Sequence, residues 1–135
     1  MTLEEINEVG TANLPGLFGI RFTHAEAGTI KAELAVRPQI MAPNGFLHAG
    51  CVVSLADSCC GWGSILTLPE GAEAFTTIEL KTNLIGTARS GIVDCTATLV
   101  HGGRTTQLWD AKVKARETGK TIALFRCTQM ILYPR

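Results

Sequence analysis

The stretch from residue 44 to residue 66 limits most strongly what this chain can fold into. From Val52 onward its apolar residues recur at the spacing of a helical face, and Val53 and Trp62 extend the apolar surface around the helix. A helix that is apolar nearly all round is a buried helix. The sequence therefore predicts one long helix in the core of the protein.

One carboxyl group interrupts this apolar helix. Between Ile40 and Pro69, Asp57 is the one carboxylate and His48 the one histidine, and no lysine or arginine falls in the interval. Burying an ionised carboxylate is costly unless a partner compensates for it. Such a conflict between a side chain and its surroundings often marks a functional site. We interpret Asp57 as a candidate catalytic residue, and the alternative is a structural aspartate bonded to backbone or hydroxyl groups.

Composition predicts a single domain that associates with itself. The chain has 135 residues, which suffice for one core, so we expect residues 1–135 to form one domain. Hydrophobic residues make up 46% and charged residues 18%, and part of this apolar surface is expected to be covered by self-association. The formal net charge is zero, which argues against a nucleic-acid partner.

The cysteines and the N-terminus bear on the compartment. Five cysteines lie in apolar segments without metal-ligand spacing, so we interpret them as buried small residues in a reducing compartment rather than disulfides or zinc ligands. The first residues lack the pattern of a signal peptide, and no apolar run reads as long enough to span a bilayer. We expect a soluble cytoplasmic protein with no metal site and no membrane association.

The rest of the chain reads as short elements separated by turns. Thr2 and Glu5 have capping-box spacing. The expected elements are a helix over 3–9, a turn over 13–16, strands over 17–24 and 29–36, an irregular connection over 38–45, and strands over 74–85, 91–100, 105–116 and 121–133. Hairpin turns join the later strands, so the sheet is largely antiparallel. Each strand must bury one face, and the central helix is the large apolar partner. We predict an α+β fold in which a curved antiparallel sheet wraps around one long buried helix.

The central stretch resembles the signature of a known family. Asn44-Gly-Phe-Leu-His48-Ala49-Gly50, followed by Leu55-Ala56-Asp57, is similar to the hotdog-fold acyl-CoA thioesterases of the phenylacetate-degradation type, near the 4-hydroxybenzoyl-CoA thioesterases. The segments 75–80, 103–105 and 117–120 resemble the family's later strands and last hairpin. The resemblance implies a hotdog fold, an acyl-CoA substrate, no bound cofactor, and a homodimer joined edge to edge with its active site at the interface. A homotetramer is common in the family.

The resemblance also implies catalytic roles. Thioester hydrolysis needs a polarised carbonyl and a positioned nucleophile, and backbone N–H groups of Ala49 and Gly50 at the helix N-terminus would polarise the carbonyl. Asp57, two helical turns after Gly50, would be the general base or a direct nucleophile that gives a mixed anhydride. His48 would orient the carbonyl or the loop, and Thr77 of the other subunit would hold the attacking water.

Further residues are candidates for substrate binding. Many relatives carry Asn or Gln six residues before the histidine, where this chain has Ala42. Asn44, beside Gly45, is the candidate substitute or else a turn residue. Arg104 and then Arg89 are candidates for contacts with coenzyme A phosphates, and the alternative for both is a solvated charge.

Trp62 is a candidate for lining the acyl pocket.

Three functions remain open for the chain. An acyl-CoA thioesterase fits best. A hotdog hydratase or dehydratase also uses an acid and a histidine but matches this spacing less well, and a non-catalytic acyl-CoA-binding protein is the third possibility. Release of a free thiol separates the first from the other two.

Overall fold

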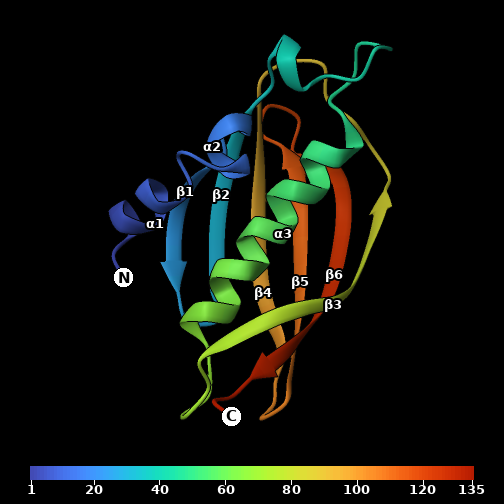
Figure 1. The fold of residues 1–135 in the computed structure, drawn as a ribbon. Helices are drawn as coiled ribbons and strands as arrows, with labels where there is room; N and C mark the ends of the chain where they lie inside the picture. The colour runs from blue at the N-terminus through green and yellow to red at the C-terminus, as the bar shows by residue number, and fades with distance from the viewer.

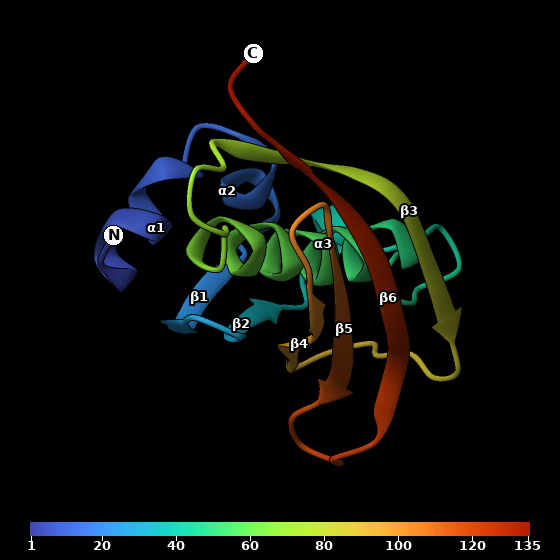
Figure 2. The ribbon, with the colours of Figure 1, turned by 90° about the horizontal axis from the view of Figure 1, so that it is seen from below.

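The computed structural model describes all residues 1–135 as three α-helices, one 3-10 helix and six strands. In chain order these are α1 (Leu3–Val9), α2 (Leu14–Phe18), β1 (Arg21–Glu26), β2 (Thr29–Ala35), η1 (Pro38–Ile40), α3 (Ala49–Leu66), β3 (Ala74–Leu84), β4 (Ile92–Gly102), β5 (Thr106–Ala115) and β6 (Thr121–Leu132). The strands form one antiparallel sheet in the order β1-β2-β4-β5-β6-β3. The sheet curves around α3 (Figures 1 and 2), so the predicted α+β hotdog architecture is confirmed.

One face of α3 packs against the inner face of the sheet. The residues buried there repeat as pairs along the helix: Cys51, Val52, Leu55, Ala56, Cys59, Cys60, Gly63 and Ser64. Gly63 permits a very close approach, because a Cβ at this position would lie 2.5 Å from Cη2 of Trp109 on β5. A helix laid this close excludes water from the core and fixes the direction in which its other side chains point.

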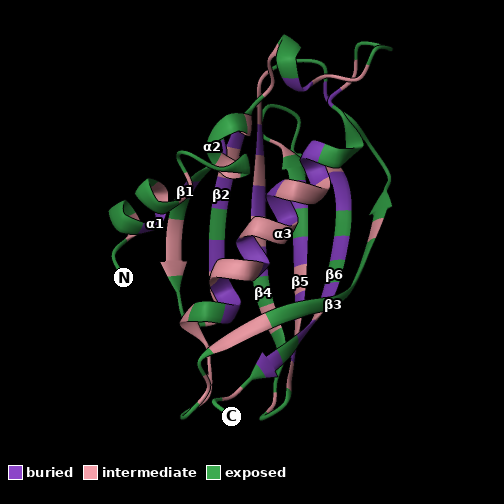
Figure 3. Ribbon diagram, in the orientation of Figure 1, coloured by how far each residue is buried: buried purple, intermediate pink, exposed green.

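The opposite face of α3 is only half-buried, which corrects the prediction of a helix buried all round. Val53, Asp57 and Trp62 lie on this second face together with Ser58 and Gly61. Figure 3 shows the two burial classes along the helix. The helix also begins at Ala49, three residues before Val52, because His48 adopts an extended conformation and caps it. Apolar periodicity cannot detect these first small residues.

The N-terminal segment differs from the prediction between residues 13 and 20. The structure has the short helix α2 where a turn and the start of a strand were expected, and β1 begins only at Arg21. Proline in the first turn of α2 is compatible with a helix start, and Gly19 ends the helix in the left-handed region at φ 78°. By contrast, α1 and its capping box are as predicted, with Thr2 Oγ1 accepting from the Glu5 N–H and Glu5 Oε2 accepting from the Thr2 N–H.

Two further predictions concern the core. All five cysteines are buried and free, as expected. The sequence analysis expected no apolar run long enough to span a bilayer. Judged by length and composition alone, this expectation is wrong, because α3 has 18 residues with a mean hydropathy of 1.3. In this fold α3 is the core helix on the inner face of the sheet, and a soluble core helix passes the same test.

Candidate functional site

The loop before α3 is held firmly against the rest of the protomer. The Leu47 N–H donates to the Ala88 carbonyl at 2.8 Å, and the His48 N–H donates to the Ile40 carbonyl at 3.1 Å. Gly45 turns the chain at φ 86°, and Asn44 Oδ1 accepts from the Phe46 N–H at 3.2 Å. The structure therefore uses the Asn44 oxygen in the turn that leads into the helix, as the turn interpretation of this residue expected.

The N-terminus of α3 presents one open backbone donor. His48 Nδ1 accepts from the Gly50 N–H at 2.8 Å, and the His48 carbonyl accepts from the Cys51 N–H at 2.9 Å and the Val52 N–H at 3.4 Å. The Ala49 N–H makes no hydrogen bond within the protomer. The candidate oxyanion donor is thus Ala49, while the Gly50 amide is engaged by the histidine that the sequence had assigned to the same site.

Asp57 lies on the half-buried face of α3 and makes no hydrogen bond or ion pair within the protomer. Burial raises the pKa of its carboxyl group above the ordinary value. Helix geometry places its Cα about 10 Å along the axis from that of Gly50, and helical side chains point back toward the N-terminus. The carboxylate therefore faces the same region as the open amide at the start of the helix.

Ser54 lies between Gly50 and Asp57 on this face, and the sequence reasoning missed it. Its hydroxyl donates to the Gly50 carbonyl at 2.8 Å, so its oxygen remains able to accept a hydrogen bond. The signal was present in the spacing, because Ser54 is four residues after Gly50 and three before Asp57. Trp62 lies five residues after Asp57, about 1.4 helical turns further along α3. It packs edge-on against Phe22, with ring centroids 6.4 Å apart.

Thr77 lies on β3, the strand that forms one edge of the sheet. It is exposed, makes no hydrogen bond through its side chain, and pairs in register with Gln129 of β6. The strand is exposed from Thr76 to Lys81, and Ile78 and Leu80 are 53% and 44% exposed. An uncovered apolar edge strand is available for pairing with a second strand.

The two candidate arginines lie at opposite ends of the protomer. The guanidinium of Arg89 stacks over the Phe46 ring at 4.3 Å, in the loop that supports the helix start. Arg89 also lines a hollow of about 370 Å³ that includes Lys120. Arg104 stacks over Tyr133 at 5.4 Å in the β4–β5 turn, at the end of the molecule where α3 finishes (Figure 1). A single protomer thus brings Arg89, but not Arg104, toward the start of α3.

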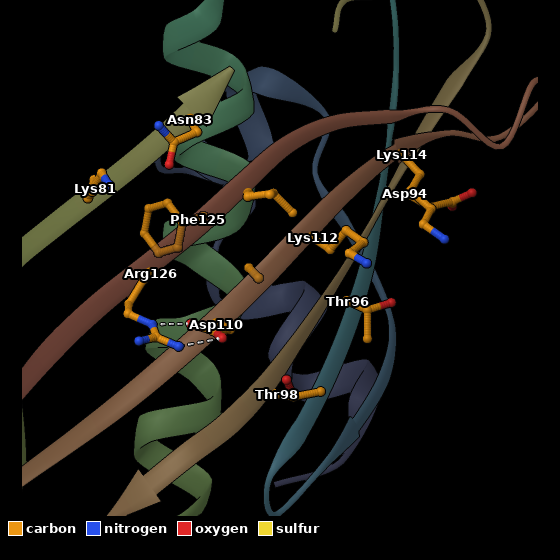
Figure 4. Close-up of a pocket in the computed structure, with 12 residues that line it drawn as sticks. Lys81, Asn83, Asp94, Thr96, Thr98, Asp110, Lys112, Lys114, Phe125 and Arg126 are labelled. Atoms are coloured by element: carbon orange, nitrogen blue, oxygen red, sulfur yellow. Dashed lines mark hydrogen bonds and ion pairs between the residues drawn. The ribbon is translucent and has the colours of Figure 1, made fainter. Parts of the chain in front are cut away.

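A separate hollow of about 710 Å³ lies on the outer face of the sheet (Figure 4). Its lining is mainly polar and charged, and Arg126 closes part of it through hydrogen bonds to Asp110 of 2.5 and 2.9 Å. The sheet separates this hollow from α3, so it is not the site defined by Asp57 and Ala49. No group of three or more His, Cys, Asp or Glu residues is arranged to hold a metal ion.

Two solved structures with the same fold are thioesterases. The chain superimposes on a mutant thioesterase from Pseudomonas aeruginosa with a TM-score of 0.91, at 30% identity over 98% of this chain and 94% of that one. A thioesterase from Haemophilus influenzae also gives a TM-score of 0.91, at 28% identity over 98% of this chain and 92% of that one. The sheet that curves around α3 is therefore the hotdog fold of a thioester hydrolase.

Sequence comparison gives the family. The family model of the thioesterase superfamily matches residues 44–122, which run from the loop before α3 to the start of β6. The chain is 32% identical to the 1,4-dihydroxy-2-naphthoyl-CoA hydrolase of Escherichia coli (strain K12), over 98% of this chain and 96% of that protein. It is also 32% identical to the protein of the same name from Listeria monocytogenes, over 82% of this chain and 88% of that protein. The chain belongs to the thioesterase superfamily.

Proposed function

We propose that this protein is an acyl-CoA thioesterase that hydrolyses an acyl- or aryl-CoA thioester to the free acid and coenzyme A. The observation that carries the proposal is an unpaired carboxyl group, Asp57, on the same helix as the open N–H of Ala49. The names of the relatives make aryl-CoA thioesters the first substrates to assay. The mechanism needs no metal and no bound cofactor.

The start of α3 polarises the substrate. The thioester oxygen accepts a hydrogen bond from the Ala49 N–H, at the positive end of the helix dipole, as negative charge develops on it. His48 keeps this donor in place by capping the next amide, that of Gly50. Removing one such donor from an enzyme typically costs about 10²- to 10³-fold in kcat.

Asp57 supplies the nucleophile by one of two routes. As a general base, the ionised carboxylate takes a proton from a water molecule that attacks the carbonyl carbon. As a nucleophile, it attacks the carbon itself, forms a mixed anhydride and is released by water. In both routes the C–S bond breaks and the thiolate of coenzyme A leaves and is protonated. Thr77 of a second protomer accepts a hydrogen bond from the attacking water.

A homodimer would complete this site. Pairing of β3 with β3 of a second copy would cover the exposed apolar edge around Ile78 and Leu80, and would bring a second sheet against the half-buried face of α3. The active site then lies at the interface, where Arg104 of the other protomer becomes available to coenzyme A beside Arg89 and Lys120. A pair of such dimers would form the tetramer.

Thiol release from a panel of aryl-, short-chain and medium-chain acyl-CoA thioesters tests the proposal. The wild type should release free coenzyme A from at least one of them. Asp57→Asn should abolish this release, whereas Ser58→Ala, a neighbouring change on the same helix, should retain it. Hydration of an enoyl-CoA without thiol release would indicate a hydratase, and binding without turnover would indicate a binding protein. Single turnover in ¹⁸O-labelled water detects the nucleophilic route, because label enters the Asp57 carboxyl group only when water attacks the aspartyl carbon of a mixed anhydride.

A further inference from the structure

Gln129 is a fully buried polar side chain without a partner. It lies on β6 with no exposed surface, and neither its Nε2 nor its Oε1 atom makes a hydrogen bond. Buried side-chain amides are nearly always hydrogen-bonded, so an orphan of this kind requires a specific explanation. A methionine of similar length would fill the same volume without leaving polar atoms unpaired. The hydrogen-bonding partner of the Gln129 amide must therefore be sought among the polar side chains next to it.

The sheet register identifies the neighbours of Gln129. On one side it pairs with Gln107 of β5, and on the other with Thr77 of β3. Directly opposite residues in an antiparallel pair carry their side chains on the same face, with Cβ atoms about 4.5–5.5 Å apart. Both neighbours are thus within reach of the Gln129 amide.

Gln107 already has a partner at each end of its amide. Its Nε2 donates to the Thr67 carbonyl at 3.0 Å, and its Oε1 accepts from the Trp109 indole at 2.8 Å. The hydroxyl of Thr77, by contrast, has no partner. Two side chains without partners therefore stand next to each other on the inner face of the sheet. The terminal torsion of a glutamine is broad, so its amide turns toward a neighbouring hydroxyl at little cost.

We propose that Gln129 is a positioning residue. Its amide oxygen accepts a hydrogen bond from the Thr77 hydroxyl and thereby orients the Thr77 oxygen toward the attacking water. This inference rests on the proposed function, which places Thr77 at that water. A nucleophilic water gives one proton to Asp57 and needs an acceptor for the other, so that its lone pair faces the carbonyl carbon. Thr77 Oγ1 can accept this hydrogen bond only if the Thr77 hydroxyl proton is directed away from the water. Gln129 Oε1, on the neighbouring strand, is an acceptor to which the hydroxyl can donate instead.

Gln129→Met, Thr77→Val and the double variant test this inference. We expect Gln129→Met to lower kcat about tenfold with KM within about twofold of wild type, because the interaction is made in the transition state. The double variant should have the kcat of Thr77→Val alone, since Gln129 acts through Thr77. Ile131→Met, on the same strand and face but without a polar group, is the matched control and should keep wild-type kcat. An unchanged kcat in Gln129→Met, or losses that multiply in the double variant, would overturn the inference.

A second readout is independent of activity. Denaturant unfolding of the same four proteins, at one protomer concentration, should show that Thr77→Val shifts the midpoint more when Gln129 is present than when Met replaces it. Equal shifts in the two backgrounds would show that the amide and the hydroxyl do not interact, and would also overturn the inference. If wild type releases no thiol from any acyl-CoA, the proposed function fails, while the unfolding comparison still decides whether the two side chains pair.

Discussion

Asp57 in the middle of α3 and His48 at its N-cap have different roles in the proposed site. The carboxyl group of Asp57 is half-buried and unpaired, so burial raises its pKa and the group is destabilising when ionised. Nδ1 of the His48 imidazole accepts from the Gly50 N–H, which makes this side chain a helix cap in this structure. One residue is thus kept reactive, and the other keeps the helix start in place.

Asp57→Asn should stabilise the fold increasingly as pH rises. The folded-state pKa of Asp57 is raised, so its contribution to stability is fully present below the unfolded-state pKa and is lost as pH rises through the folded-state pKa. Asparagine removes this loss. The denaturant midpoint for unfolding of the variant should therefore exceed that of wild type at about pH 8, where the Asp57 carboxyl group is ionised. The two midpoints should approach each other at about pH 4, where the group is largely protonated in the folded protein. A variant less stable than wild type at pH 8 would contradict the assignment.

Replacing His48 separates its capping role from catalysis. His48→Ala removes the acceptor for the Gly50 N–H, and loss of an N-cap costs about 0.5–2 kcal/mol of stability. His48→Asn offers another good capping side chain and should recover most of that stability in denaturant unfolding. If the asparagine variant also recovers kcat, the histidine acts by holding Ala49 in place; a kcat that stays low would mean that the imidazole contacts the substrate itself.

The two faces of α3 explain why the element is both a core helix and a site. Its buried face meets β2, β4, β5 and β6, and Gly63 fits under the Trp109 ring. Its other face carries Asp57 and Ser54 over a half-buried surface. The tight packing on the first face fixes the second, because the helix cannot rotate without moving Trp109, which is itself bonded to Gln107.

Gly63→Ala and Gly61→Ala form a matched pair on this helix. A Cβ at residue 63 would lie 2.5 Å from the Trp109 ring, so Gly63→Ala should destabilise the protein by about 1–3 kcal/mol through overpacking. A Cβ at residue 61 would lie 3.5 Å from Phe75 Cζ, an ordinary contact. Gly61→Ala should therefore be neutral or stabilising by up to about 1 kcal/mol from helix propensity. Denaturant midpoints check both, and equal effects of the two changes would contradict the close approach.

For the whole molecule, the proposed site residues are spread over distant parts of the protomer. Asp57 and Ala49 lie on α3, Thr77 lies on the exposed edge strand, and Arg104 lies at the far end of the sheet. The uncovered edge of β3 and the half-buried face of α3 are the two surfaces that a second copy would cover. The proposed mechanism therefore predicts that catalysis depends on assembly.

Mixing two variants with impaired sites tests this prediction. If each site takes Asp57 from one protomer and Thr77 from the other, a heterodimer of Asp57→Asn and Thr77→Val contains one intact site. Random exchange of equal amounts should then restore about a quarter of wild-type activity, since half of the dimers are mixed and each has one good site of two. Each variant alone, denatured and refolded in parallel, is the control. Activity no greater than the average of the two controls would place the whole site within one protomer.

The sequence predicted most of the fold because its signals are local. The alternation over Thr29–Ala35, the capping box of α1 and the hairpin turns each depend on a few neighbouring residues, and all appear as expected. The short helix α2 was missed because Pro15 and Gly16 also favour a turn, and only the contact of this segment with α3 in the folded chain selects the helix. Ser54 and Gln129 were missed because a serine in a helix and a glutamine in a strand carry no distinctive pattern of their own.

The sequence by itself determined where the long helix lies, which strands alternate, and that a lone carboxyl group sits on the helix, since these follow from periodicity and from the absence of nearby charge. Only the tertiary structure decided that His48 occupies the Gly50 amide and leaves that of Ala49 open, that one face of α3 stays half-uncovered, and that Gln129 lies beside Thr77. The physical reason is that helix capping, side-chain packing and strand register depend on groups that the folded backbone brings together. The pattern of neighbouring residues in the sequence does not specify these contacts.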